Sequence, residues 1–181
     1  MRHPEIMHKL QTEIRGAFKN YHEIDTASVA NLEYLTAVLN EAMRIMAPVP
    51  WIPSRVVPPG GDTVDGHFIP GGTYVSTGYV SAARSPDNFK NPEEFRPERW
   101  LTVNGVPSGD NLEASQPFSL GSRVCIGKQL AWTEMRLMLA KIHFKFDLTP
   151  VDRDLDWISA TQFKLLWDKP ALMVRFKERA D

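Results

Sequence analysis

The sequence predicts an α+β fold that is mainly helical and carries small antiparallel sheets. Three segments have apolar residues at the spacing of one helix face, and short runs of β-favouring residues are separated by glycine and proline. The 181 residues, 43% of them hydrophobic and 24% charged, have the size and composition of one ordinary globular domain.

Two helices are expected in the first part of the chain. Residues 4–18 begin with a proline, which suits the first turn of a helix, and carry an amphipathic pattern. Residues 31–46 carry a second apolar stripe, which Pro48 ends. The apolar residues of the two stripes are Ile6, Leu10, Ile14, Phe18, Leu32, Leu35, Leu39, Ala42 and Met46.

The middle of the chain is expected to hold a hairpin and a long irregular segment. The hairpin is expected over residues 63–77, around Pro70-Gly71-Gly72, with residues 67–69 on one arm and 73–75 on the other. Residues 84–117 are expected to be mostly irregular, because they show neither the helical nor the strand periodicity of apolar residues over an extended stretch. Such stretches are usually functional or held by special contacts.

A third strong helix is expected over residues 130–142. Strand-like alternation follows it at residues 144–148. The chain is expected to end in a second hairpin over residues 162–176, around Asp168-Lys169-Pro170.

Charge and composition exclude several classes of protein. With 21 basic and 22 acidic residues, the net charge of −1 gives no electrostatic reason to expect a nucleic-acid partner. The single cysteine forms no internal disulfide, which favours a reducing compartment. No apolar run is long enough to span a bilayer, and residues 1–5 lack a signal-peptide core, so the chain is expected to be soluble or peripheral.

Residues 118–127 place the only cysteine, Cys125, between two glycines and directly before the third helix. The unpaired N–H groups and the macrodipole of a helix start favour a thiolate. Gly121 permits a sharp bend, Gly127 permits close approach of a flat ligand, and Arg123 adds a cation that can hold a carboxylate. A planar iron cofactor with acidic side groups fits this arrangement.

The pattern F-x-x-G-x-R-x-C-x-G is matched at every fixed position and resembles the haem-binding loop of the cytochrome P450 family. The resemblance implies haem b, iron protoporphyrin IX, as cofactor, with Cys125 as axial iron ligand. It also implies that Arg123 pairs with a haem propionate and that Phe118 packs beneath the macrocycle. A lone cysteine is usually a small buried hydrophobe, but the setting of this one favours a ligand role. A cysteine thiolate bound to haem iron favours O–O bond cleavage.

A second signature of the family lies upstream. Glu41 and Arg44 are three residues apart on the second helix, and taken alone they read as a pair on an exposed face, worth about 0.2–0.5 kcal/mol. With Pro97-Glu98-Arg99 downstream, the resemblance implies a structural Glu41–Arg44–Arg99 network that locks the irregular segment against the helix behind the haem. Trp100 stands where phenylalanine is commonest, a departure that keeps an aromatic residue and puts little of the resemblance in doubt.

The roles of some further site residues are predicted only from their positions in the sequence. Arg55 occupies the place where relatives carry an arginine that reaches the second haem propionate, and the alternative is a solvated arginine in a strand. Val49, Trp51 and Ile52 would line the substrate side of the iron, with residues 162–166 as further candidates. Apolar residues in these places are equally explained as core.

The resemblance covers nearly all 181 residues but only the last part of the family's fold. Residues 1–181 would therefore form a partial cytochrome P450 domain, without the central oxygen-activating helix and the amino-terminal half. The implied reaction is insertion of one atom of O2 into a lipophilic organic substrate, with electrons from NADPH through NADPH-cytochrome reductase. The complete enzyme would lie on the cytosolic face of the endoplasmic reticulum membrane, and the style of residues 92–100 and 167–170 looks eukaryotic, microsomal and fungal.

Other functions remain open. The chain is alternatively a truncated, non-catalytic or merely haem-binding product, or part of a haem-thiolate isomerase or dehydratase that needs no external electrons. A cysteine hydrolase would use Cys125 as nucleophile and a histidine as base, but it leaves the second signature unexplained. The five histidines lack the spacing of a zinc site.

Overall fold

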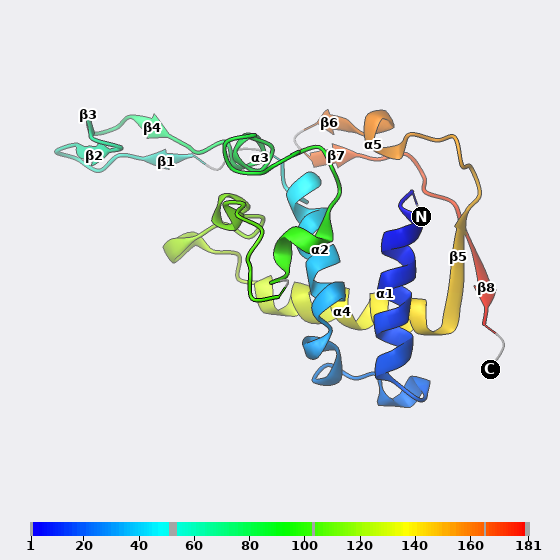
Figure 1. The fold of residues 1–181 in the computed structure, drawn as a ribbon. Helices are drawn as coiled ribbons and strands as arrows, with labels where there is room; N and C mark the ends of the chain where they lie inside the picture. Colours follow the sequence, from blue (N-terminus) through cyan, green and yellow to red (C-terminus); the bar gives the residue numbers. More distant parts are fainter. Residues whose placement is uncertain (1, 51–53, 103, 165, 180–181) are drawn as a thin grey trace.

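The computed structural model describes residues 2–50, 54–102, 104–164 and 166–179. Its centre is formed by three helices, α1 (Pro4–Ala17), α2 (Glu33–Ile45) and α4 (Lys128–Lys145), which pack against one another (Figure 1). All three were predicted, and their observed bounds lie within a few residues of the predicted ones. The α+β class is thereby confirmed.

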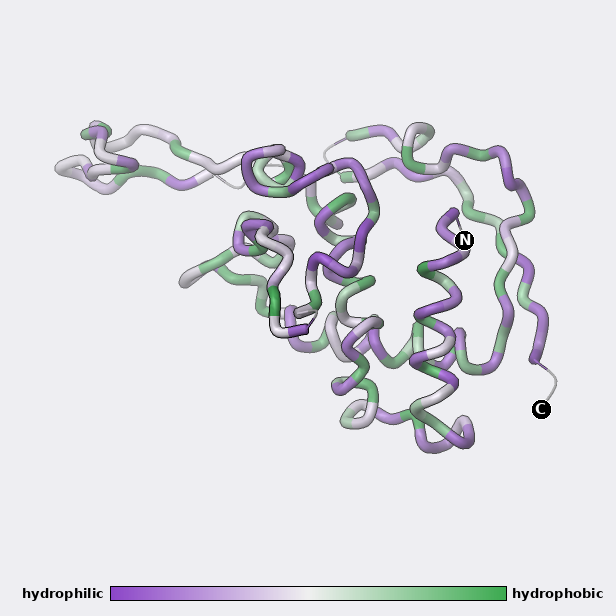
Figure 2. The backbone as a smooth tube through the Cα atoms, viewed as in Figure 1, coloured by the Kyte–Doolittle hydropathy of each residue, from purple (hydrophilic) through white to green (hydrophobic). Residues whose placement is uncertain are grey.

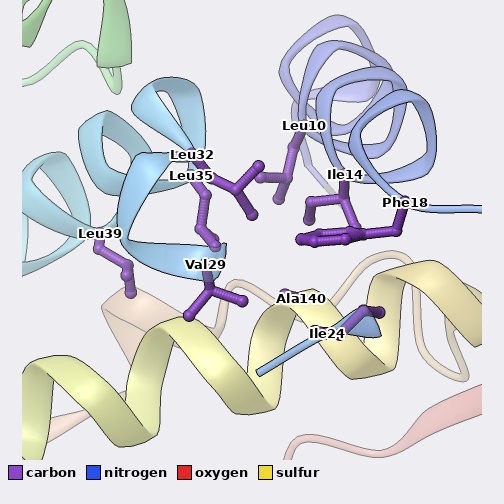
Figure 3. Packing of buried hydrophobic residues seen from close by; sticks show 9 residues of the cluster. All are labelled: Leu10, Ile14, Phe18, Ile24, Val29, Leu32, Leu35, Leu39 and Ala140. Atoms are coloured by element: carbon purple, nitrogen blue, oxygen red, sulfur yellow. The ribbon is translucent and has the colours of Figure 1, made fainter. Parts of the chain in front are cut away.

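The core lies where these helices meet (Figure 3). Residues from α1 and α2 rest on one side of α4, where Ala140 is fully buried. The cluster consists of Leu10, Ile14, Phe18, Ile24, Val29, Leu32, Leu35, Leu39 and Ala140. The two apolar stripes of the sequence therefore face each other and α4, as their helical spacing requires.

Shorter elements surround this centre. Between the helices lie the 3-10 helices η1 (Tyr21–Glu23), η2 (Ser28–Asn31), η3 (Pro97–Trp100), η4 (Leu112–Ala114) and η5 (Gly121–Arg123) and the short helices α3 (Tyr79–Ala83) and α5 (Trp157–Ala160). The strands are β1 (Arg55–Val56), β2 (Asp62–Val64), β3 (His67–Ile69), β4 (Tyr74–Val75), β5 (Phe146–Pro150), β6 (Gln162–Lys164), β7 (Leu166–Asp168) and β8 (Val174–Glu178). None of the described helices is long and apolar enough to cross a membrane.

Strands β1 to β4 form an arm that extends away from the helices (Figure 1). The predicted pairing of residues 67–69 with 73–75 is wrong, because β3 pairs with β2 and β4 pairs with β1, both antiparallel. The tight turn is Asp65-Gly66, where both residues have positive φ, as a two-residue hairpin turn requires. Hydrophobic and hydrophilic residues interleave along the arm (Figure 2).

The predicted hairpin over residues 162–176 is also wrong. Strand β7 turns back at once onto β6, whereas β8 pairs with β5 over five residues, from Phe146 opposite Glu178 to Pro150 opposite Val174. Pro170 cannot donate a backbone hydrogen bond, and its carbonyl accepts one from the Trp157 indole at 2.8 Å. The last strand, β8, therefore pairs with β5 in the longer ladder of the two.

Helix α1 supplies side chains that satisfy the ends of the two other long helices. The Glu13 carboxylate accepts hydrogen bonds from the backbone N–H groups of Tyr34 and Leu35, at 2.7 and 2.8 Å, at the start of α2. Arg15 donates from Nε to the His143 carbonyl and from a terminal nitrogen to that of Phe146, at 3.0 and 3.2 Å, at the end of α4. Both ends would otherwise leave backbone groups unpaired.

His143 on α4 predicts a dependence of stability on pH. Its side chain is buried, Nδ1 has no described hydrogen-bond partner, and burial together with the charge of Arg15 lowers its pKa to about 4. The unfolded chain therefore binds a proton between pH 6.5 and 4 that the folded chain does not bind, so stability falls as the pH falls through this window. We expect a loss of about 3 kcal/mol from this residue.

The measurement is urea unfolding at several pH values for the native chain and for His143→Gln. The variant is expected to lose this component of the pH dependence while keeping the acid sensitivity of the carboxylates below pH 4.5. Equal slopes for the two chains between pH 6.5 and 5 would contradict the assignment.

Candidate functional site

Residues 118–127 form a compact loop that ends at the start of α4. The Cys125 N–H donates to the Phe118 carbonyl at 2.9 Å, and the Val124 N–H donates to that of Gly121 at 3.1 Å. The chain reverses through two residues with left-handed backbone, Ser119 at φ 63° and Gly121 at φ 72°. The glycine was expected to provide the bend and adopts this conformation without strain, whereas nothing in the sequence singled out Ser119, which has a side chain, for the left-handed region.

The thiol of Cys125 is exposed at the start of α4. The Lys128 N–H donates to the Cys125 carbonyl at 3.2 Å, so the helix begins directly behind the sulfur. A Cβ added at Gly127 would stand 3.8 Å from Sγ, in the space beside the sulfur. Among the exposed side chains of the loop and the first turn of α4, the apolar ones are Leu120, Val124, Ile126 and Leu130.

These surroundings fit a flat, largely apolar cofactor. The described residues contain no group of three or more His, Cys, Asp or Glu side chains that could hold a metal ion. A single soft sulfur donor on an apolar platform suits an iron whose remaining ligands come from a macrocycle. The residues present are therefore compatible with haem.

The other residues expected around the cofactor are Phe118 and Arg123, which belong to this loop, and Arg55, which lies beside it. The Phe118 ring packs on α4, with its centroid 6.3 Å from that of Trp132. Arg123 is exposed and has no ion-pair partner among the described residues. Arg55 lies in β1 and lines a hollow of about 400 Å³ together with Ser119 and Leu120, so the arm brings it beside the loop.

Glu41 and Arg44 are buried, which makes the exposed-face interpretation of this pair wrong. The guanidinium of Arg44 donates two hydrogen bonds to the Glu41 carboxylate, at 2.9 and 2.8 Å, and Arg99 Nε donates to Glu41 Oε1 at 3.0 Å. None of the three residues is more than 1% exposed. The structure thus brings the three predicted residues together in one buried network.

The network extends to residues that the sequence analysis missed. Asp110 accepts from Arg99 at 2.6 Å and from Arg96 at 3.1 Å, and the fully buried Phe89 ring lies beneath both Arg44 and Arg99. Arg44 also donates to the carbonyls of Ala83, Pro92 and Glu94. These side chains replace the backbone ladder that residues 84–110 lack.

Both acids of the network are held in the charged form. Burial alone would raise the pKa of Glu41, but hydrogen bonds from Arg44, from the Arg96 N–H and from Trp100 outweigh it and lower that pKa. Burial likewise works against ionisation of Asp110, and its pKa is lowered by the Lys90 N–H and by Arg99. A buried carboxylate shared by two arginines is stable only as an anion.

A family model described as "Cytochrome P450" matches residues 1–176. The chain belongs to the cytochrome P450 family. The structure agrees: it superposes on the crystal structure of the cytochrome P450DA heme domain with a TM-score of 0.83 and 26% identity, covering 99% of this chain and 38% of that one.

Three curated P450 relatives of this chain come from fungi. The averantin hydroxylase of Dothistroma septosporum is 45% identical over 182 residues, covering 99% of this chain and 34% of that protein. The fusicoccadiene 8-ol C-16-hydroxylase of Phomopsis amygdali is 44% identical, covering 97% and 33%, and the cytochrome P450 monooxygenase BipB of Cochliobolus sativus is 48% identical, covering 97% and 34%. This P450 chain therefore spans about a third of the length of these relatives.

The residues predicted to line the substrate side of the iron are either exposed or outside the described residues. Val49 is exposed, and Trp51 and Ile52 lie outside the described residues. Within the 162–166 stretch, Phe163 and Leu166 are exposed on the β6–β7 hairpin. This hairpin is held to the end of α2 by the Trp167 indole, which donates to the Ala47 carbonyl at 2.6 Å.

Trp100 contributes to the P450 network more than its aromatic ring. Its indole Nε1 donates to Glu41 Oε2 at 2.9 Å, a bond that phenylalanine cannot make. We expect Trp100→Phe to cost about 1.5–3 kcal/mol in the free energy of unfolding, because a hydrogen bond to a buried charge is lost. Urea unfolding measures this cost.

Trp132→Phe is the matched control, since no described side-chain hydrogen bond involves the Trp132 indole, which lies beneath the Arg136 guanidinium. A cost for Trp100→Phe no larger than that of the control would show that the Glu41 bond adds nothing measurable.

Proposed function

We propose that residues 1–181 form the carboxy-terminal part of a haem-thiolate monooxygenase, which inserts one atom of O2 into a lipophilic organic substrate. The observation that carries this proposal is the exposed Cys125 thiol on an apolar platform at the start of α4. The names of the relatives as hydroxylases and monooxygenases support the reaction class.

Four residues of the loop, and Arg55 outside it, have roles in this proposal. Cys125, at the start of α4, would provide the sulfur ligand of the haem iron. Arg123 and Arg55 hold the two propionates, Phe118 packs against the macrocycle, and the absence of a side chain at Gly127 lets the haem plane approach the helix. Haem b, when bound, supplies reductive activation of O2.

The buried network fixes the position of these groups relative to the helices. Glu41, Arg44 and Arg99 fasten α2 to the segment between Ala83 and Asp110. That segment leads into the thiol loop, so the network keeps the loop at a fixed place relative to the helices. Its role is structural, since its members are buried and paired with one another.

The complete enzyme would contain parts that are not represented in residues 1–181. We place there the amino-terminal half and the central oxygen-activating helix. The enzyme would lie on the cytosolic face of the endoplasmic reticulum membrane and take electrons from NADPH through NADPH-cytochrome reductase. Val49, Trp51 and Ile52 would line the substrate side of the iron.

The proposal is tested with a chimera in which these 181 residues replace the matched third of the Dothistroma averantin hydroxylase. The reduced, carbon-monoxide-treated chimera is expected to show the red-shifted absorption band of thiolate-ligated haem, whereas residues 1–181 alone should take up haem weakly or not at all. A haem-loaded chimera without that band would overturn the assignment. Product formed without any electron donor would favour an isomerase or dehydratase.

A further inference from the structure

Trp132 is a large aromatic residue of α4 that lies against the thiol loop. It stands one turn after the first residue of α4 and seven residues after Cys125. Its indole contacts the Phe118 ring, with the two centroids 6.3 Å apart and the planes tilted by 43°. The roles proposed for the loop residues do not include this contact.

Arg136, one turn further along α4, connects the indole to α2. Its guanidinium lies 4.7 Å from the centroid of the Trp132 ring, as residues four apart on a helix allow. Its Nε donates to Thr36 Oγ1 at 3.2 Å, and the Thr36 hydroxyl itself donates to the Leu32 carbonyl at 2.8 Å. The hydroxyl hydrogen is thus directed to the carbonyl, which leaves the oxygen free to accept from Arg136.

The contact between Trp132 and Arg136 is stronger than a contact on an open surface. Arg136 is half-buried, and burial lowers its pKa. Within the described part of the chain it forms no ion pair with a carboxylate. A guanidinium that is partly removed from water gains more from an aromatic face than an exposed one does. The indole therefore has a fixed neighbour on α4 in addition to Phe118.

The position of Phe118 is coupled to that of Cys125 through the backbone. The Phe118 carbonyl accepts a hydrogen bond from the Cys125 N–H at 2.9 Å. A displacement of Phe118 therefore moves the backbone that carries the sulfur. The groups packed around a metal-bound sulfur, and the access of water to it, set the reduction potential of the metal.

We propose that Trp132 is a positioning residue of the haem site: held by Arg136, it keeps Phe118 in place beside the Cys125 sulfur and so keeps the reduction potential of the bound iron low. The inference rests on the proposed function, in which Cys125 is the axial ligand. Without the indole, Phe118 gains freedom and water reaches the sulfur. Hydrogen bonds from this water stabilise the additional negative charge of the reduced iron and its sulfur ligand, which raises the potential.

The test is a reductive titration of the haem-loaded chimera. At a fixed applied potential, Trp132→Leu is expected to raise the ratio of reduced to oxidised haem by about tenfold, which is about 59 mV for one electron. The red-shifted carbon-monoxide band should remain, because the sulfur is untouched.

A loss of stability alone would not distinguish this role, because Trp132 also packs against the hydrophobic core. Leu139→Ala is the matched control, since Leu139 packs against the same core two turns farther from the thiol. It should weaken the fold and change the ratio by less than about twofold.

Arg136→Lys separates positioning from a direct effect of charge. The substitution keeps the positive charge but lacks the flat guanidinium and the Nε donor. If Arg136 acts by holding the indole, the ratio should rise by about threefold, in the same direction as for Trp132→Leu. A direct effect of the charge on the iron would leave the ratio unchanged.

Hydrogen exchange gives a second readout of the same coupling. In the haem-loaded chimera, the Cys125 amide should exchange about tenfold faster in Trp132→Leu than in the native sequence, because its acceptor on Phe118 is no longer held. Leu139→Ala should leave this exchange within about twofold of the native rate. Mass spectrometry of the peptides that cover residues 118–127 measures it.

The proposal is overturned if Trp132→Leu leaves the ratio within about twofold of the native value, or if Leu139→Ala shifts it as far. If Trp132→Leu takes up no haem, Arg136→Lys decides, and an unchanged ratio in that variant overturns the proposal. A native chimera without the red-shifted band overturns the proposed function and this inference with it. A native chimera with the band, and no shift in Trp132→Leu, overturns this inference alone.

Discussion

Replacing Cys125 with serine is expected to abolish the red-shifted carbon-monoxide band of the chimera completely, together with monooxygenation. Residues 1–181 contain one thiol, so no other cysteine of these residues can take its place. A serine hydroxyl stays protonated at neutral pH and is a much poorer donor to iron than a thiolate, which is the ligand that favours O–O cleavage. The measurement is the reduced carbon-monoxide difference spectrum at equal haem content.

The matched control is Ser122→Ala, which alters an equally exposed residue of the same loop without touching the sulfur. It should keep the full band. Persistence of the red-shifted band in Cys125→Ser would show that the sulfur is not the axial ligand.

Replacing Glu41 with alanine is expected to give the largest loss of stability, about 3–5 kcal/mol in the free energy of unfolding. The carboxylate accepts from Arg44 twice, from Arg99, from the Arg96 N–H and from Trp100. Its removal leaves two buried guanidinium groups without their shared anion, and a buried charge without a partner costs more than the pair contributed. Urea unfolding of residues 1–181 and of the chimera measures the effect.

Glu33→Ala is the control on the same helix, because Glu33 is exposed in the first turn of α2 and should cost less than about 1 kcal/mol. Similar losses for the two variants would mean that the network contributes no more than a surface charge. Because the pKa of Glu41 is lowered in the folded chain, its contribution should be present above pH 4.5 and disappear as the pH falls below it.

The helices could be predicted from the sequence because each carries apolar residues at a spacing that is local to the helix itself. The strand pairings could not, because pairing is decided between segments. Asp65-Gly66 and Pro70-Gly71-Gly72 are competing turn signals a few residues apart, and only the first forms the tight hairpin turn. Strand β8 follows β7 closely in the chain, whereas its partner β5 lies more than twenty residues earlier. When short strands have similar β-favouring residues, the sequence of each strand does not indicate which other strand it pairs with.

The candidate site followed from two motifs, which named the thiol loop and the three members of the buried network. Asp110 escaped because it belongs to neither motif and lies in a segment without periodicity. The donor role of Trp100 escaped because a substitution within the aromatic residues looks conservative unless the position of Glu41 is known. Burial of the Glu41 and Arg44 pair depends on residues 83–110 folding over it, which no local pattern reveals.

Glu13 and Arg15, two residues apart on α1, hold the beginning of α2 and the end of α4. Slippage or fraying of this part of α1 would release both helix ends at once, so the three helices should open together as one cooperative unit. Their amide protons would then share a common protection against solvent exchange, although the three helices are far apart in the chain.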